Sequence, residues 1–163
     1  MADFKKILVA VAFSEYSEEI FLYASELASR LASDLIVASI INQRDVQQIQ
    51  RIQDMGYAMD SEQYVRDIKA ERKRILEGLI KKAGFPAERI RTIFRVGNPI
   101  DALLKIIMAE DVDMVVMGLK GRTDLEHVII GSVADKLFRR SPVTVVSFRD
   151  RKSRERLKAR IHA

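Results

Sequence analysis

Hydrophobic residues along this chain alternate between short continuous runs and longer segments with helical spacing. The continuous runs predict β-strands that are buried on both faces, because such runs leave few polar positions to face solvent. Five segments are predicted as strands: residues 7–13 (ILVAVAF), 35–41 (LIVASII), 90–96 (IRTIFRV), 113–117 (DMVVM) and 143–148 (VTVVSF). Since parallel strands need a crossover between them, the intervening helical patterns predict one α/β domain, a parallel five-stranded sheet with helices on both faces.

Four helices are predicted from apolar residues three and four apart, at residues 17–31, 62–83, 99–108 and 132–140. Residues that favour helix ends support these boundaries. Ser17 is the expected N-cap of the first helix, Gly84 follows the end of the second, and Asn98-Pro99 opens the third. The third helix is expected to bury one face, made of Ile100, Leu103, Leu104, Ile107 and Met108.

The segment 42–60 has a different character, because it is rich in glutamine and carries apolar residues three apart. Val46, Ile49, Ile52 and Met55 have this spacing. The pattern predicts an irregular or helical insertion. Two roles remain open for it: a lid that folds over a ligand, or an insertion without function.

Composition excludes several classes of protein. The chain has 163 residues, of which 48% are hydrophobic and 31% charged, and this is typical of a single globular domain. No apolar run reaches the ~18 residues that span a membrane, so no membrane association is expected. The chain has no cysteine, which excludes disulfides, thiolate metal sites and thiol nucleophiles. A cytoplasmic location is therefore expected.

The net charge of +5 resides in the last fifteen residues. Residues 149–163 (RDRKSRERLKARIHA) hold seven basic and two acidic residues, which leaves 28 − 7 = 21 basic and 23 − 2 = 21 acidic residues in the body, 1–148. The chain thus divides into a neutral domain and a basic tail. A solvated terminal helix is favoured for the tail over a polyanion-binding arm, and nucleic acid is not an expected partner.

Three of the chain's seven glycines follow the fourth predicted strand, at positions 118, 121 and 131. Ligands of parallel α/β sheets bind beyond the carboxyl ends of strands, where glycine lets backbone amides approach a ligand closely. Gly131 and Ser132 open the next helix, whose N-terminal amides attract anions, and Lys120 adds positive charge nearby. The spacing predicts a phosphate site. The alternative is that each glycine only serves a turn or a helix end.

At these residues the chain resembles the universal stress protein family, over about residues 4–148. The resemblance rests on ILVAVAFSEYS, VGNP and the closing segment from VDMVVMGLKGRTDLEHVIIGSVA to VTVVSF. Its specific part is the motif G-x2-G-x9-G-[ST]. The resemblance implies the strand order 3-2-1-4-5 and, in the nucleotide-binding branch, ATP between the ends of strands one and four. It implies that Gly118, Gly121, Gly131 and Ser132 face the phosphates with Lys120 and Val133 beside them, and that Val11, Ala12, Ile40 and Met117 surround the adenosine.

One position departs from the family pattern. The family usually has an aspartate at the end of strand one, whereas this chain has Ala12 in the sequence VAFS. The missing carboxylate is a hard oxygen ligand of the kind that Mg²⁺ prefers. We expect nucleotide binding with weak dependence on Mg²⁺, AMP or ADP being accepted as readily as ATP, and no metal site is predicted.

The sequence does not predict an enzyme. Neither G-x-x-x-x-G-K-[ST] nor G-x-G-x-x-G is present, and no Ser/His/Asp arrangement is legible. Of the two histidines, His162 lies in the tail, and His127 lies in the glycine-rich segment, where a solvated side chain is the usual finding. No catalytic residue is predicted, although slow ATP hydrolysis stays open.

Two functional classes remain. The first is an adenine-nucleotide-responsive regulator in a stress response, acting on a protein partner of unknown identity. The second is a dimeric interaction module whose glycine-rich segment is only structural. Both predict a homodimer through residues 143–148, because an apolar strand at the edge of a sheet favours pairing with a second copy.

Overall fold

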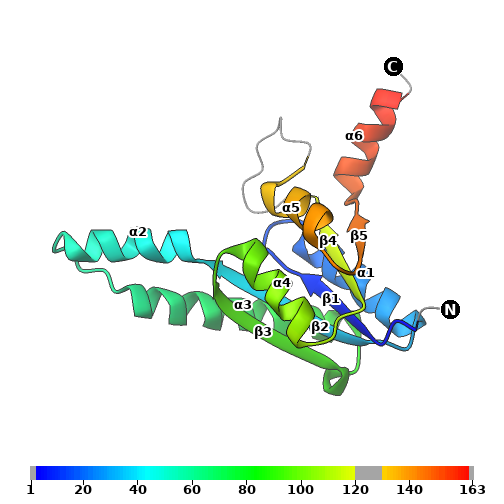
Figure 1. Ribbon diagram of the computed structural model, residues 1–163, viewed down its shortest axis with the longest axis horizontal. Helices are drawn as coiled ribbons and strands as arrows, with labels where there is room; N and C mark the ends of the chain where they lie inside the picture. The colour runs from blue at the N-terminus through cyan, green and yellow to red at the C-terminus, as the bar shows by residue number, and fades with distance from the viewer. Residues whose placement is uncertain (1–2, 120–129, 162–163) are drawn as a thin grey trace.

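The computed structural model describes residues 3–119 and 130–161 and contains one parallel sheet. Its strands run in the order β3-β2-β1-β4-β5, as the sequence resemblance implied (Figure 1). The strands are β1 (Lys6–Ala10), β2 (Asp34–Asn42), β3 (Ile90–Gly97), β4 (Met114–Gly118) and β5 (Thr144–Phe148). Because every pairing is parallel, all five strands end at one side of the sheet, which we call the carboxyl edge. The opposite side, where they begin, is the amino edge.

Six α-helices and one 3₁₀ helix lie within the described residues. They are α1 (Ser17–Arg30), α2 (Gln43–Asp54), α3 (Ser61–Ala83), η1 (Ala87–Arg89), α4 (Pro99–Ala109), α5 (Ser132–Arg140) and α6 (Arg151–Ile161). Helix α2 forms in the segment 42–60, where the sequence predicted an irregular or helical insertion, and α6 forms in the basic tail.

The sheet separates two hydrophobic cores. Alternate residues of β1 show the division: Ile7 and Val9 pack with α1 and α3, whereas Leu8 packs with α4 and α5. All three side chains are fully buried. Because residues of a strand alternate between faces, the position of a residue in a strand decides which pair of helices it contacts. This rule assigns the candidate ligand residues to one face or the other.

Helix ends agree with the sequence predictions at two positions and differ at a third. Gly84 ends α3 in the left-handed conformation, at φ 63°. The Asn98 Oδ1 atom accepts hydrogen bonds from the amides of Ile100 and Asp101 at 3.1 and 3.3 Å. The prediction of Ser17 as an N-cap was wrong, because Ser17 is the first residue of α1 and its Oγ accepts a hydrogen bond from the Ser14 amide at 2.9 Å.

Two apolar patterns were also assigned incorrectly. Met108, expected on the buried face of α4, is 67% exposed, while Ile106 is buried in its place. The first strand ends at Ala10 rather than at residue 13, because Phe13 has a φ of +54° and the chain leaves the sheet before it. The first error concerns the face of α4, since Met108 lies within the helix, and the second concerns the length of the strand.

The segment after β2 forms a helical hairpin, which we call the arm: α2 and the first half of α3 (Figure 1). Ser61 joins its two helices, because the Ser61 Oγ donates to Gln50 Oε1 at 2.7 Å and the Ser61 amide donates to Gln53 Oε1 at 3.3 Å. Asp60 caps α3 through the amides of Glu62 and Gln63. No residue of α2 is buried, so the arm lies outside both cores.

The basic tail forms α6, as expected. The Asp150 carboxylate holds its start by accepting the amide and the hydroxyl of Ser153 at 2.8 and 2.6 Å. From there α6 extends away from the sheet (Figure 1). Among the described residues, no helix has the length and apolar composition that would let it cross a membrane.

Candidate functional site

The carboxyl edge between β1 and β4 brings several of the predicted ligand residues together. β4 ends at Gly118, and Gly131 immediately precedes α5. The Gly131 amide donates to the Leu119 carbonyl at 2.7 Å, which holds the start of α5 beside the end of β4. Lys120 and Gly121 of the glycine motif lie outside the described residues.

The start of α5 presents backbone donors at this edge. Gly131 is its N-cap and, lacking a side chain, provides no acceptor for the first turn. The amides of Ser132, Val133 and Ala134 have no intrahelical acceptor, because the first turn of any helix lacks one. Ser132 is exposed, whereas Ala134 is buried. The helix dipole adds positive potential here, so the first turn suits an anion.

The Gly131 amide differs from the sequence-based expectation that the glycine amides are free to bind phosphate. The Gly131 amide is not available to a phosphate, because it already bonds Leu119. The donors at this end are therefore the amides of the first turn of α5. Gly131 contributes by leaving these amides without a side-chain cap, and Ser132 is the first helical residue rather than the cap.

The four residues predicted around the adenosine divide between the two faces of the sheet. Ile40 and Met117 pack on the face of α4 and α5, together with Val133 of the glycine motif. Ala12 is half-buried, two residues beyond the end of β1. The Val11 side chain instead belongs to the core of α1 and α3, while its amide donates to the Ala38 carbonyl at 3.1 Å. Val11 can therefore line this site only through its main chain.

Sequence reasoning missed a buried arginine behind the site. Arg72 of α3 is only 5% exposed, and it lies against the ends of β1 and β2. A signal was present: Arg72 follows Ile68 by four residues and precedes Leu76 by four, so it lies on the apolar stripe of its helix. A charged residue at such a position is either solvated at a helix end or held by specific contacts within the fold.

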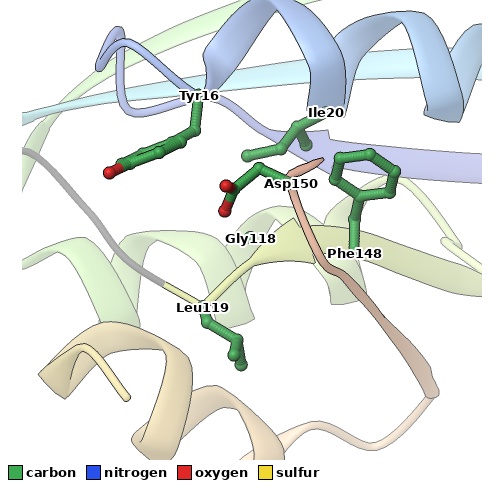
Figure 2. Close-up of a pocket in the computed structure, with 6 residues that line it drawn as sticks. All are labelled: Tyr16, Ile20, Gly118, Leu119, Phe148 and Asp150. Carbon is green, nitrogen blue, oxygen red and sulfur yellow. The ribbon is translucent and has the colours of Figure 1, made fainter. Parts of the chain in front are cut away.

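A small pocket lies on the other side of β4, next to α1 (Figure 2). In the close-up, Tyr16, which precedes α1, and Ile20 of α1 face Phe148 and Asp150, with Gly118 and Leu119 below. The pocket has a volume of about 10 Å³, which is room for about one water molecule. Sites for drug-sized ligands measure roughly 300–1,000 Å³, so this pocket does not accommodate a nucleotide.

Among the described residues, metal-ligating side chains do not gather at this edge. In residues 3–119 and 130–161, no three histidine, aspartate or glutamate side chains are grouped so that they could hold a metal ion. Ala12 stands where the family pattern has a carboxylate. In the described part of this edge, the groups suited to bind an anion are therefore the backbone amides of α5.

Comparisons with known proteins identify relatives of this chain. The family model described as "Universal stress protein family" matches residues 3–149. Universal stress protein MJ0577 of Methanocaldococcus jannaschii is 27% identical over 153 residues, covering 88% of this chain and 94% of the relative. Putative universal stress protein SSP1056 of Staphylococcus saprophyticus is 27% identical over 150 residues, with coverages of 91% and 86%.

Solved structures show the same fold. The structure of MJ0577 superposes with a TM-score of 0.75 at 25% identity, covering 92% of this chain and 99% of that one. A universal stress protein in complex with cAMP gives a TM-score of 0.64 at 22% identity, with coverages of 91% and 98%. The protein from Archaeoglobus fulgidus in complex with dAMP gives 0.58 at 17%, with coverages of 91% and 100%. The last two likenesses show the fold alone.

Proposed function

We propose that this chain, which belongs to the universal stress protein family, is an adenine-nucleotide-binding regulator rather than an enzyme. One observation carries the proposal: the uncapped first turn of α5 lies beside the end of β4, at the same edge as Ala12, Ile40 and Met117. Backbone donors for phosphate thus lie next to apolar side chains that suit a base. Two structural neighbours are described in complex with cAMP and dAMP, and these ligands are adenine nucleotides.

The phosphates would bind at α5 and the adenosine toward β1 and β2. The amides of Ser132 and Val133 point along the helix axis, so they donate to phosphate oxygens without a change in side-chain conformation. The Ser132 hydroxyl is exposed and adds a further donor. Ile40 and Met117 contribute apolar contacts to the base. Gly118 allows the ligand to approach the end of β4 closely.

The role of the metal is expected to be small. Mg²⁺ usually binds protein carboxylates together with phosphate oxygens, and Ala12 supplies no carboxylate. The loss also removes negative charge from the neighbourhood of the phosphates, which favours the free nucleotide. We propose that ATP, ADP and AMP bind with similar affinity and with little help from Mg²⁺.

A melting series with ATP, ADP, AMP and cAMP, each with and without Mg²⁺, tests the proposal. A ligand at 100 times its dissociation constant adds ~2.7 kcal/mol of stability. For a domain of this size that is a rise in Tm of roughly 5–10 °C. A rise of this size without Mg²⁺ supports nucleotide binding. Unchanged Tm values with all four ligands at millimolar concentration would refute it and favour the interaction module with a purely structural glycine motif.

We further propose that the chain forms a homodimer through residues 143–148. β5 pairs with β4 on one side only and is the last strand of the sheet. Val145 and Val146 are only half-buried there. An edge strand with exposed apolar area favours pairing with a second copy. Light scattering should show a dimer at micromolar concentration, and Val145→Lys should yield a monomer with an unchanged circular dichroism spectrum; a monomeric wild type would contradict the proposal.

A further inference from the structure

Arg72 joins three elements at the carboxyl edge. Its side chain comes from α3 and reaches the end of β2, where Nη1 donates to Ser39 Oγ at 3.0 Å and to the Ile40 carbonyl at 3.1 Å. The guanidinium also lies over the ring of Phe13, 5.2 Å from its centroid. Phe13 follows the end of β1. The three contacts therefore connect α3 with the ends of both strands next to the candidate site.

The backbone at Phe13 needs such support. Its φ of +54° is in the left-handed region, which costs free energy for a residue with a bulky side chain. A conformation of this kind persists only where the surroundings hold it. The planar, desolvated guanidinium against the ring provides a cation–π contact that stabilises the ring where it is. The contact thus holds the backbone at Phe13 in the conformation that turns the chain away from the sheet.

Residue 12 lies between the groups that Arg72 contacts. The register of β1 and β2 pairs Ala10 with Ala38, and the Val11 amide bonds the Ala38 carbonyl. Continued by two residues, this register sets Ala12 beside Ile40. Arg72 bonds the Ile40 carbonyl on one side and contacts the Phe13 ring on the other. The position of Ala12 therefore depends on a side chain on the opposite face of the sheet.

We propose that Arg72 is a positioning residue for the nucleotide site: from behind the sheet it fixes Ala12 and Ile40 at the separation that the adenosine needs. The inference rests on the proposed function for the identity of the ligand. The effect of Arg72 on the positions of Ala12 and Ile40 does not depend on that function. Arg72 is buried behind the sheet on α3, so its proposed effect on the ligand acts through Ala12 and Ile40.

The chain contains a matched control. Arg89 also lies over a phenylalanine ring, 5.5 Å from the centroid of Phe85, and bonds Asp34 Oδ1 at 3.0 Å. Asp34 begins β2, so this second arginine joins its neighbours at the amino edge, away from the site. Arg72→Lys and Arg89→Lys make the same chemical change at opposite ends of the sheet. Lysine retains the charge but loses the planar fork that can stack and donate twice.

Calorimetric titration of both variants with AMP and ATP is the first measurement. Arg72→Lys should weaken nucleotide binding about tenfold, while Arg89→Lys should match the wild type. Phe13→Gly should weaken binding as well, because it removes the ring. In the Phe13→Gly background, Arg72→Lys should reduce nucleotide affinity less than threefold, because the contact between Arg72 and the Phe13 ring is already absent. Equal affinities of Arg72→Lys and wild type, or an equal loss in Arg89→Lys, would overturn the inference.

A second measurement needs no ligand. In the free protein, the amide resonances of Ala12 and Ile40 should shift in Arg72→Lys and stay in place in Arg89→Lys. If the wild type binds no nucleotide yet these resonances shift, the proposed function fails and the positioning role of Arg72 stands without that ligand. If the wild type binds nucleotide and the resonances do not move, the function stands and the positioning role is wrong. Melting temperatures establish that each variant is folded.

Discussion

At the amino edge of the sheet, side chains form hydrogen bonds with backbone groups that the strands leave unpaired. At the carboxyl edge, no side chain of the described residues accepts the amides in the first turn of α5. Asp113 Oδ2 accepts the amides of both Lys5 and Lys6 at 2.9 Å, and Lys6 Nζ donates to the Glu110 carbonyl at 2.8 Å. The Ser33 hydroxyl likewise donates to the Phe4 carbonyl. The carboxyl edge instead has a glycine N-cap at α5 and a strained backbone at Phe13.

This difference between the two edges implies that one contributes mainly to the stability of the fold and the other to ligand binding. A polar backbone group that bonds a fixed side chain stabilises the fold and is unavailable to a ligand. A group without such a partner contributes less to stability but can bind an incoming anion. Substitutions at the amino edge should therefore change the free energy of unfolding alone. Substitutions between β1 and β4 at the carboxyl edge should change nucleotide affinity. Four variants, from both edges of the sheet, test this division.

Gly131→Asp should have the largest effect on binding. The φ of Gly131 is −66°, which any residue adopts, and aspartate is a favourable N-cap. Its carboxylate would accept the first-turn amides and repel phosphate, so the ~2.7 kcal/mol of ligand-linked stability expected at 100 times Kd should vanish. The melting temperature without ligand should be unchanged or higher. Gly78→Asp, on an exposed position of α3, introduces the same charge away from the site and should keep the ligand response.

Asp113→Ala tests the amino edge. It removes the acceptor of two amides, which should lower the free energy of unfolding by about 2 kcal/mol. Nucleotide affinity should not change. Denaturant unfolding and calorimetric titration measure the two quantities, and Asp3→Ala controls for the loss of one charge at the same edge. A fall in affinity as large as that in stability would break the division.

Asn98→Ala sharpens the comparison within the carboxyl edge. Asn98 follows β3 and caps α4, so its side chain accepts backbone amides as Asp113 does at the other edge. Its loss should cost about 1 kcal/mol of stability. Binding should persist, because the cap lies beside β3 rather than between β1 and β4. Chemical denaturation with and without AMP distinguishes the two effects.

Ala12→Asp should give the smallest change. It restores a carboxylate that can help to hold Mg²⁺ beside the phosphates. We expect ATP affinity to fall a few-fold without Mg²⁺ and to recover when it is added, which corresponds to ~0.5–1 kcal/mol. Calorimetric titrations with ATP, without Mg²⁺ and with Mg²⁺ in excess over ATP, measure the two affinities. A large dependence on Mg²⁺ in the wild type would contradict the proposed role of Ala12.

Local sequence signals predicted much of the fold. The left-handed φ of Gly84 and the cap at Asn98 follow from the chemistry of single residues, and the five strands follow from apolar runs. Two features depended on tertiary contacts and could not be predicted in this way. The helical spacing places Arg72 on an apolar stripe, but it does not show which groups hold the charge there. Phe13 looks like one more residue of an apolar strand until its φ is known.

The candidate site shows the same limits. The glycine motif predicted where β4 ends and α5 begins, because glycine is favoured where the backbone leaves a strand or enters a helix. It could not predict that the Gly131 amide bonds Leu119, since that contact depends on how the two elements meet. The Val11 side chain packs in the same core as Ile7 and Val9, as alternation along the strand requires, so its assignment to the ligand by resemblance holds only for its main chain.

The arm gives the protein a natural place for an optical label. The chain has no cysteine, so a thiol introduced at Ala58, in the exposed turn between α2 and α3, would be the only one in the molecule. From that turn, α3 runs about 17 Å as a rigid rod from Ser61 to Arg72. A dye on this thiol would be attached next to the helix that contacts the ends of β1 and β2, and its emission should report nucleotide binding at the carboxyl edge.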